Sequence, residues 1–219
     1  MATEKEKLYR FVDNLREQLH IPSFGFTVNA VDLCRDINRI DIEYANLHSR
    51  GLCGLAMLGD KIDTIILNKQ RSKEEQNFDC AHELIHVTHH RGRSSCFNCF
   101  SEVRPQQDSF IEWQANEGAA QLLVPYQDFI PRFLRDFDFR KVFGDFDIIG
   151  TLAFHYGVTP QVIRNRIECL SYEMDQYQRG VDVMSLQFLS KNQRTKLDIR
   201  PTNYLSLCEF PLDWDSKIG

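Results

Sequence analysis

The chain has 219 residues, of which 42% are hydrophobic and 26% charged, and its formal net charge is −5. This composition indicates a globular protein with one sizeable core, and it excludes the domain-wide basic excess typical of nucleic-acid-binding proteins. The first residues lack an apolar signal segment, and no run of about 18 apolar residues occurs, so we expect a cytoplasmic protein without a membrane-spanning helix.

Seven cysteines are scattered along the chain, and this odd number favours reduced thiols over a disulfide framework. Cys96-Phe-Asn-Cys99 is a single C-x-x-C pair, and no second pair is spaced to complete a zinc knuckle. We therefore do not predict a structural metal at this pair.

Two helices and three strands are predicted before residue 70. Apolar residues recur at helical spacing over residues 3–20, and a shorter helix is expected over 30–40. The period then changes, and runs of apolar residues separated by turn residues predict strands at 42–47, 51–58 and 62–68. A small sheet thus directly precedes the next helix, and its edge can take up a peptide as an extra strand.

Residues 72–90 are predicted to form the helix around which the chain is organised. Ser72-x-x-Glu75 is a capping box, no Pro or Gly occurs before Gly92, and apolar residues form a stripe along the helix. A largely buried helix of this kind must give its polar side chains partners, because unpaired buried polar groups are costly.

This helix carries His82-Glu83-Leu-Ile-His86, an H-E-x-x-H pattern. His82 and His86 lie on one face, so both imidazoles can point at a single Zn²⁺. Glu83 follows the first ligand directly, where its carboxylate can reach a water molecule at the metal without binding the metal itself. His89 and His90 lie too far along the helix to share the ion, and we expect both at the rim or surface.

The third ligand is expected from a second helix, predicted over residues 109–124. Glu112 is the candidate, because peptidase zinc sites of the two-His, one-Glu type take their glutamate from a later helix. Asn116, one turn on, can hold a ligating imidazole by its free nitrogen. Two alternatives stay open: Ser109-x-x-Glu112 is itself a capping box, and Glu117, about 140° round the helix from Glu112, is a rival ligand.

The segments on either side of this second helix carry weaker patterns. Residues 91–107 are long, polar and contain a proline, which predicts a loop. Residues 126–145 are rich in Phe and in charge, and we interpret them as core packing and a lid.

Residues 147–172 predict a helix, a turn and a second helix that Thr159-Pro160 opens. The shape is that of a helix-turn-helix reader of DNA. However, Arg164 and Arg166 are the only basic residues of the second helix, and DNA binding needs several cations. We therefore expect this segment to pack against the rest of the protein rather than to contact DNA.

The segments NKQRSKEEQNFDCAHELIHVTHH, EWQANEGAAQLLVP and LAFHYGVTPQVIRNRI together resemble the ImmA/IrrE family of metallopeptidases. Members are similar to F-x-x-A-H-E-L-x-H, then E-x-x-A-N-x-x-A-x-x-L-L-x-P, then L-A-x-x-F-x-V-S, and the resemblance covers roughly residues 40–170. Two positions depart from the pattern: Ile85 stands where many members have Gly, and Gly118 stands where Phe is frequent.

The resemblance implies an α+β fold with a reduced zincin-like core, made of the small sheet, the H-E-x-x-H helix and the Glu-bearing helix, followed by a helix-turn-helix-like segment. It places the metal ligands on His82, His86 and Glu112 and the general base on Glu83. The expected divisions are a core, a helical segment packed on it, and a tail or small appendage, at residues 1–145, 146–175 and 176–219.

The function that the resemblance implies is that of an endopeptidase with one Zn²⁺ that cuts a DNA-binding repressor of a mobile element or stress response. Mn²⁺ or Fe²⁺ would suit the same ligands. We expect an oxyanion or substrate contact among Tyr126, His155 and Tyr156. Two alternatives stay open: a regulatory protein that binds a repressor without cutting it, and a DNA-binding module at 147–172. The residues do not specify an oligomeric state.

Overall fold

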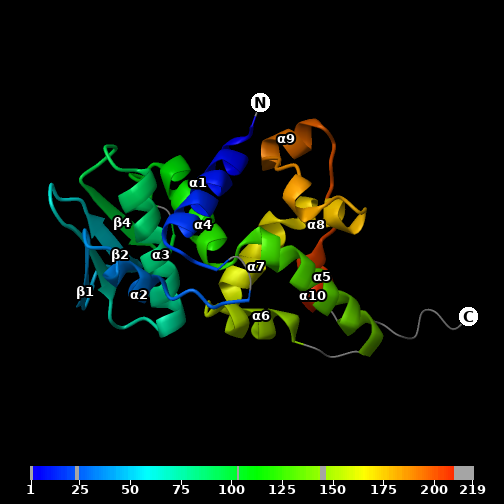
Figure 1. The fold of residues 1–219 in the computed structure, drawn as a ribbon, viewed down its shortest axis with the longest axis horizontal. Helices are drawn as coiled ribbons and strands as arrows, with labels where there is room; N and C mark the ends of the chain where they lie inside the picture. The colour runs from blue at the N-terminus through cyan, green and yellow to red at the C-terminus, as the bar shows by residue number, and fades with distance from the viewer. Residues whose placement is uncertain (1, 23–24, 103, 144–146, 210–219) are drawn as a thin grey trace, which may run out of the picture.

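The structure is a computed structural model that describes residues 2–22, 25–102, 104–143 and 147–209. A four-stranded sheet with its covering helices lies at one end of the molecule, and a group of helices lies at the other (Figure 1). This confirms the predicted α+β class, with a small sheet and a helical segment behind it. The expected division at 145/146 and the last part of the tail, 210–219, lie outside the described residues.

The sheet contains the three strands that the sequence predicts and one that it does not. They are β1 (Ile40–Ala45), β2 (Leu52–Met57), β3 (Asp63–Asn68) and β4 (Cys96–Phe100), in the order β1-β3-β2-β4. β1 runs parallel to β3, whereas β2 runs antiparallel to both β3 and β4. β4 therefore lies at an edge of the sheet, and it comes from the stretch 91–107 for which we predict a loop.

The prediction of a loop there is wrong because the strand signal is short. Phe97 and Cys99 are buried, whereas Cys96 and Asn98 are exposed, and this alternation has the period of a strand with one buried face. Cys96 and Cys99 consequently point to opposite faces of the sheet.

The central helix, α3 (Lys73–His89), begins where the sequence predicts. The Ser72 hydroxyl accepts from the Glu75 amide, and the Glu75 carboxylate accepts from the Ser72 amide, which completes the capping box. α3 packs against β2, β3 and β4 and also against α2 (Ala30–Arg35) and α4 (Ser109–Leu123). α1 (Glu4–Gln18) packs on α4 in turn.

The contact between α3 and α4 explains both departures from the family pattern. A Cβ atom added to Gly118 would lie 3.0 Å from the side chain of Ile85, closer than an ordinary contact. Ile85, from α3, thus fills space that a large residue would otherwise fill from α4. The two departures therefore compensate each other: the larger residue stands on α3 and the smaller one on α4. Changes that keep the total volume in this way preserve core packing.

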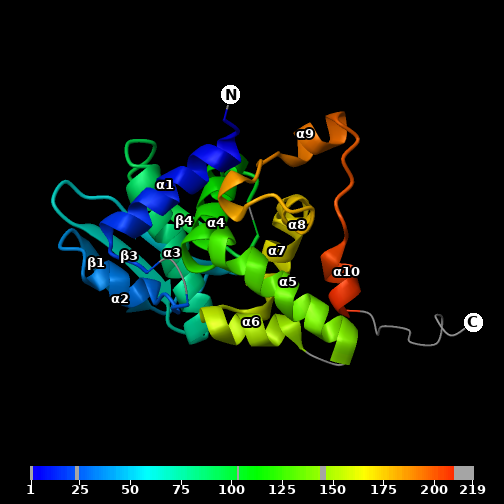
Figure 2. The same ribbon diagram turned by 45° about the vertical axis from the view of Figure 1, so that its right-hand side comes forward.

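The helical end follows α4 in the chain. It consists of α5 (Tyr126–Phe143), α6 (Ile148–Tyr156), α7 (Pro160–Cys169), α8 (Ser171–Gln178), a short 3-10 turn (Val183–Ser185), α9 (Lys191–Lys196) and α10 (Tyr204–Glu209). α6 ends at Gly157 in the left-handed conformation (φ 62°), and Thr159 caps α7, as the sequence predicts. Within the expected tail, Tyr204 is buried edge-on against Phe133 and Phe137, which places α10 beside α5 (Figure 2).

A buried ion pair joins the helical end to the sheet-bearing end. Arg166 of α7 lies 2.8 Å from the Glu117 carboxylate of α4 and also donates to the Tyr9 hydroxyl of α1. The Arg166 side chain is fully buried. One of the two basic residues of this helix is therefore enclosed in the core and not available to DNA.

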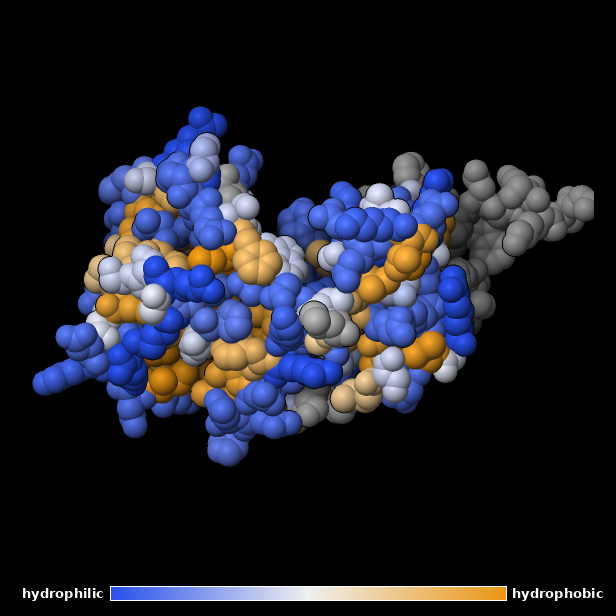
Figure 3. Space-filling view, turned by 90° about the horizontal axis from the view of Figure 1, so that it is seen from above, coloured by the Kyte–Doolittle hydropathy of each residue, from blue (hydrophilic) through white to orange (hydrophobic). Residues whose placement is uncertain are grey.

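The face drawn in Figure 3 mixes polar and apolar residues. Seen from above, it is hollowed between the sheet-bearing part on the left and the helices on the right (Figure 3). Among the described residues, no helix combines the length and the apolar character needed to cross a membrane.

Candidate metal centre

Three side chains from the two central helices converge at one point. The Nε2 atoms of His82 and His86, one turn apart on α3, lie 3.0 Å from each other. Glu112 of α4 places one carboxylate oxygen 3.4 Å from His82 Nε2 and the other 3.8 Å from His86 Nε2. All three side chains are buried, and their candidate ligand atoms lie within 4.8 Å of one another.

Neither alternative for the third ligand is found: Glu112 does not cap its helix, and Glu117 does not face the histidines. The helix is capped by Asp108, whose carboxylate accepts from the amides of Phe110 and Ile111, so Glu112 is not needed as a cap. Glu117 points away from the two imidazoles and pairs with Arg166. The structure therefore brings Glu112, and not Glu117, to the histidine pair.

The outer nitrogens of both imidazoles also have partners. His82 Nδ1 lies 3.1 Å from the Asn116 side-chain oxygen, the position proposed for that residue from sequence. His86 Nδ1 lies 3.0 Å from His90 Nδ1, and His90 Nε2 lies 3.3 Å from the Gln114 side-chain oxygen. One set of tautomers satisfies these three contacts: His82 donates to Asn116, His86 donates to His90, and His90 donates to Gln114. It leaves the Nε2 atoms of His82 and His86 without protons, facing each other at 3.0 Å, as two ligands of one cation would be.

His90 thus contradicts the expectation that it lies at the rim. It is 3% exposed and sits between His86 and Gln114. The sequence contains a signal for this, because His90 is four residues from His86 and hence on the same face of the helix. His89, by contrast, is partly exposed and packs on Phe11 with ring centroids 4.4 Å apart.

The protonation of the histidines suits a metal. Burial, helped by the neighbouring His82 and His90 rings, lowers the pKa of His86 to about 2. Burial likewise lowers the pKa of His90 to about 4. Both imidazoles are therefore neutral at physiological pH, and neutral imidazole is the form that binds metal ions.

Glu83 lies beside these residues and is fully buried, and neither carboxylate oxygen has a hydrogen-bond partner in the described part of the chain. Burial, followed by the nearby carboxylates of Glu112 and Asp79, raises its pKa well above the ordinary value. A buried carboxylate without partners is costly unless a ligand satisfies it. The imidazoles of His82 and His86, the Glu112 carboxylate and this unpaired group fit a single divalent cation with a reacting water.

Replacing His90 should weaken metal binding without removing a ligand. In a His90→Phe variant the Nδ1 of His86 loses its acceptor, so we expect metal affinity to fall roughly 10- to 100-fold, as for other groups that orient ligands. Competition with a chelator of known affinity measures this. His89→Phe, one residue away and outside the chain of hydrogen bonds, is the matched control, and an equal loss in both variants would contradict the role of His90.

The three residues proposed for an oxyanion or substrate contact do not reach the histidine pair. Tyr126 stacks on Tyr9, with ring centroids 5.5 Å apart, in the core. The Tyr156 hydroxyl donates to Asp128 at 2.7 Å, and His155 Nε2 lies 3.9 Å from the same carboxylate. The polar groups of Tyr156 and His155 therefore face Asp128 of α5. No described contact joins any of the three residues to the histidine pair, and their role as an oxyanion or substrate contact stays a prediction.

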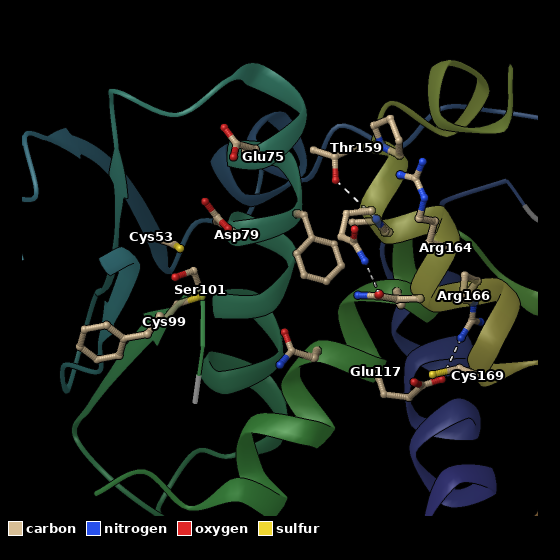
Figure 4. Close-up of a pocket in the computed structure, with 18 of the residues that line it drawn as sticks. Cys53, Glu75, Asp79, Cys99, Ser101, Glu117, Thr159, Arg164, Arg166 and Cys169 are labelled. Atoms are coloured by element: carbon tan, nitrogen blue, oxygen red, sulfur yellow. Dashed lines mark hydrogen bonds and ion pairs between the residues drawn. The ribbon is translucent and has the colours of Figure 1, made fainter. Parts of the chain in front are cut away.

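A cavity of about 800 Å³ opens beside the centre, between β2, β4, α3, α4 and α7 (Figure 4). Asn116 lines it and at the same time contacts His82. Its walls also carry Cys53, Cys99 and Trp113 from the sheet-bearing end and Arg164 from α7. No local pattern in the sequence reveals this cavity, because its two sides come from segments about a hundred residues apart.

The sequence model of the IrrE N-terminal-like domain, Peptidase_M78, matches residues 37–168. The chain belongs to this family. The match covers the sheet, both helices of the metal centre and α7, and it confirms the resemblance found from the motifs.

Individual relatives are more distant. The chain is 30% identical over 119 residues to the phage-like element PBSX protein XkdA of Bacillus subtilis (strain 168), a match that covers 54% of this chain and 53% of that protein. The chain therefore spans about half the length of this curated relative. A solved Mycobacterium tuberculosis transcriptional regulator aligns over 76% of this chain and 48% of its own, with a TM-score of 0.49 and 13% identity.

Proposed function

We propose that the protein is a cytoplasmic, zinc-dependent endopeptidase that cuts one peptide bond in a DNA-binding repressor. The observation that carries this proposal is the convergence of His82, His86 and Glu112 beside the unpaired carboxylate of Glu83, in a chain of the IrrE N-terminal-like family. XkdA is named as a protein of a phage-like element, which supports a setting in a mobile element.

In this proposal His82, His86 and Glu112 would hold the ion. When bound, Zn²⁺ polarises the scissile carbonyl and makes a water molecule more acidic. Glu83 takes the proton of the attacking water and passes it to the leaving amine. Its burial suits this role, because a raised pKa makes the carboxylate a stronger base.

The edge strand β4 is the proposed support for the substrate. An edge strand offers unpaired backbone donors and acceptors to an extended peptide. Phe97 of β4 stacks on His86 with ring centroids 4.3 Å apart, so a peptide added along β4 passes next to the centre.

Two alternatives differ from this proposal. A regulatory protein that binds a repressor without cutting it would use the same surface and would not need Glu83. A DNA-binding module at 147–172 is disfavoured by the burial of Arg166 and by the net charge of −5.

The test uses metal-free protein and a purified candidate DNA-binding repressor. Adding one equivalent of Zn²⁺ should generate a single new amino terminus in the repressor, detected by mass spectrometry, and 1,10-phenanthroline should prevent it. Mg²⁺, which prefers oxygen ligands, should not replace Zn²⁺. Release of uncut repressor from its DNA by the metal-free protein would instead favour the binding alternative.

A further inference from the structure

A bulge in the sheet brings two cysteines together next to the metal centre. Leu52 pairs with Phe100 and Gly54 pairs with Cys99, so Cys53 is an extra residue in β2. In a regular strand, Cys53 and Gly54 would point to opposite faces, but a bulge sets both opposite one residue of the neighbouring strand. The side chain of Cys53 therefore turns toward Cys99.

The two thiols are close to each other and to the centre. Cys53, Asp79 and Cys99 have polar atoms within 4.8 Å of one another, and Figure 4 shows them gathered on one side of the cavity. Cys99 also lies within 4.8 Å of a ring nitrogen of His82 and of a Glu83 carboxylate oxygen. Cys99 thus connects the thiol pair with the first ligand and the proposed base.

Both cysteines can be reached by a small reagent. They are 2% and 6% exposed, yet both line the cavity of about 800 Å³. A hydrogen bond with Cys99 lowers the pKa of Cys53 and, as its counterpart, raises that of Cys99. Cys53 therefore loses its proton more readily than Cys99, and the resulting thiolate is the reactive form of cysteine.

We propose that Cys53 and Cys99 form a reversible disulfide on reaction with a small-molecule disulfide such as oxidised glutathione. The Cys53 thiolate attacks the reagent, which forms a mixed disulfide and releases one glutathione thiolate. Cys99 then loses its proton to solvent and attacks the Cys53 sulfur, which forms the intramolecular bond and releases the second glutathione. The protein loses two electrons and two protons, and the reagent is reduced to two thiols.

The consequence for the metal centre rests on the function proposed above. Bond formation draws the Cys99 sulfur toward Cys53 and away from Glu83 and His82. We expect metal affinity to weaken about tenfold, which is the lower end of the effects seen for groups that surround metal ligands. Peptide hydrolysis should fall with it, and a dithiol reductant should restore both.

The chain supplies a matched control in a second cysteine pair. Cys34 and Cys80, on α2 and α3, have sulfurs 3.7 Å apart, and both are 0% exposed. Neither lines the cavity. The sulfurs are close together in both pairs, but only Cys53 and Cys99 line a cavity, so Cys34 and Cys80 should stay reduced under the same treatment.

The experiment treats the zinc-loaded 219-residue chain with a series of ratios of reduced to oxidised glutathione. Peptide mapping without reduction should show a cross-link between the Cys53 and Cys99 peptides, with the loss of two hydrogen atoms. The cross-link should persist in Cys34→Ser and disappear in Cys53→Ser and in Cys99→Ser. Chelator competition on each form gives the change in metal affinity.

Three outcomes would overturn the proposal: both thiols remain open to alkylation, Cys34 and Cys80 cross-link first, or a second equivalent of Zn²⁺ occupies Cys53 and Cys99 and blocks oxidation. The proposed hydrolase fails separately. If the cross-link forms and metal affinity changes but no form of the protein cuts a repressor, the proposed disulfide is supported and the proposed peptidase activity is rejected.

Discussion

A Glu83→Gln variant should keep its metal and lose hydrolysis. The amide is isosteric with the carboxylate but cannot accept a proton from water, so the rate should fall by about 10²- to 10⁴-fold, the usual contribution of a general base. Metal content should be unchanged, because Glu83 is not among the three residues that converge on the candidate ion. Cleavage rate and metal analysis on the same preparation measure both effects.

The same substitution should not weaken the metal-free fold. Both oxygens of Glu83 are buried and lack a hydrogen-bond partner among the described residues. The amide loses no hydrogen bond that Glu83 makes and carries no charge, so it costs no more to bury than either form of the acid, and the thermal midpoint should stay level or rise. Glu74→Gln, an exposed position on the same helix, is the control. If the Glu83 variant released a repressor as well as the native protein, regulation by binding alone would be the better description.

The parts of the site that were predictable are those that a single helix specifies. The positions of His82, Glu83 and His86 follow from helical spacing, and the capping box that starts their helix is complete within four residues. The same holds for the cap that Thr159 supplies to α7. In each case the partners are neighbours in the chain, so no tertiary information is needed.

The parts that were missed depend on partners far apart in the chain. β4 exists because it pairs with β2, some forty residues earlier, and its own five residues carry only a weak alternation. The place of His90 depends on Gln114, 24 residues on, and that of Glu117 depends on Arg166, 49 residues on. The bulge at Cys53 is a property of strand register, which periodicity within β2 cannot reveal.

The second large effect is expected on metal content, where alanine variants of Glu112 and Glu117 distinguish the two candidates for the third ligand. Glu112→Ala removes one of three candidate ligands, so we expect metal content at equimolar Zn²⁺ to fall to near zero while the folded structure persists. Glu117→Ala should retain the metal, because its carboxylate faces Arg166 and Tyr9 instead. Metal analysis after desalting, with circular dichroism as the check on folding, separates the two variants.

Glu117→Ala should instead be costly to stability. Arg166 and Glu117 are both nearly or fully buried, and removing one partner of such a pair strands the other charge, at a cost of about 3 to 5 kcal/mol. Burial raises the pKa of Glu117, but Arg166, Lys5 and the Tyr9 hydrogen bond outweigh it, and the pKa lies below the ordinary 4.5. The pair therefore stabilises the fold above pH 4.5, and this contribution is lost as the pH falls through the lower folded-state pKa.

Urea unfolding at neutral pH and at a pH below the folded-state pKa of Glu117 tests the contribution of this ion pair to stability. The difference in unfolding free energy between the native chain and Glu117→Ala should be large at neutral pH and should shrink in acid, because protonation removes the native ion pair. Loss of metal from a folded Glu117→Ala protein, with normal metal content in Glu112→Ala, would reverse the assignment of the third ligand and with it the geometry on which the proposed hydrolysis depends.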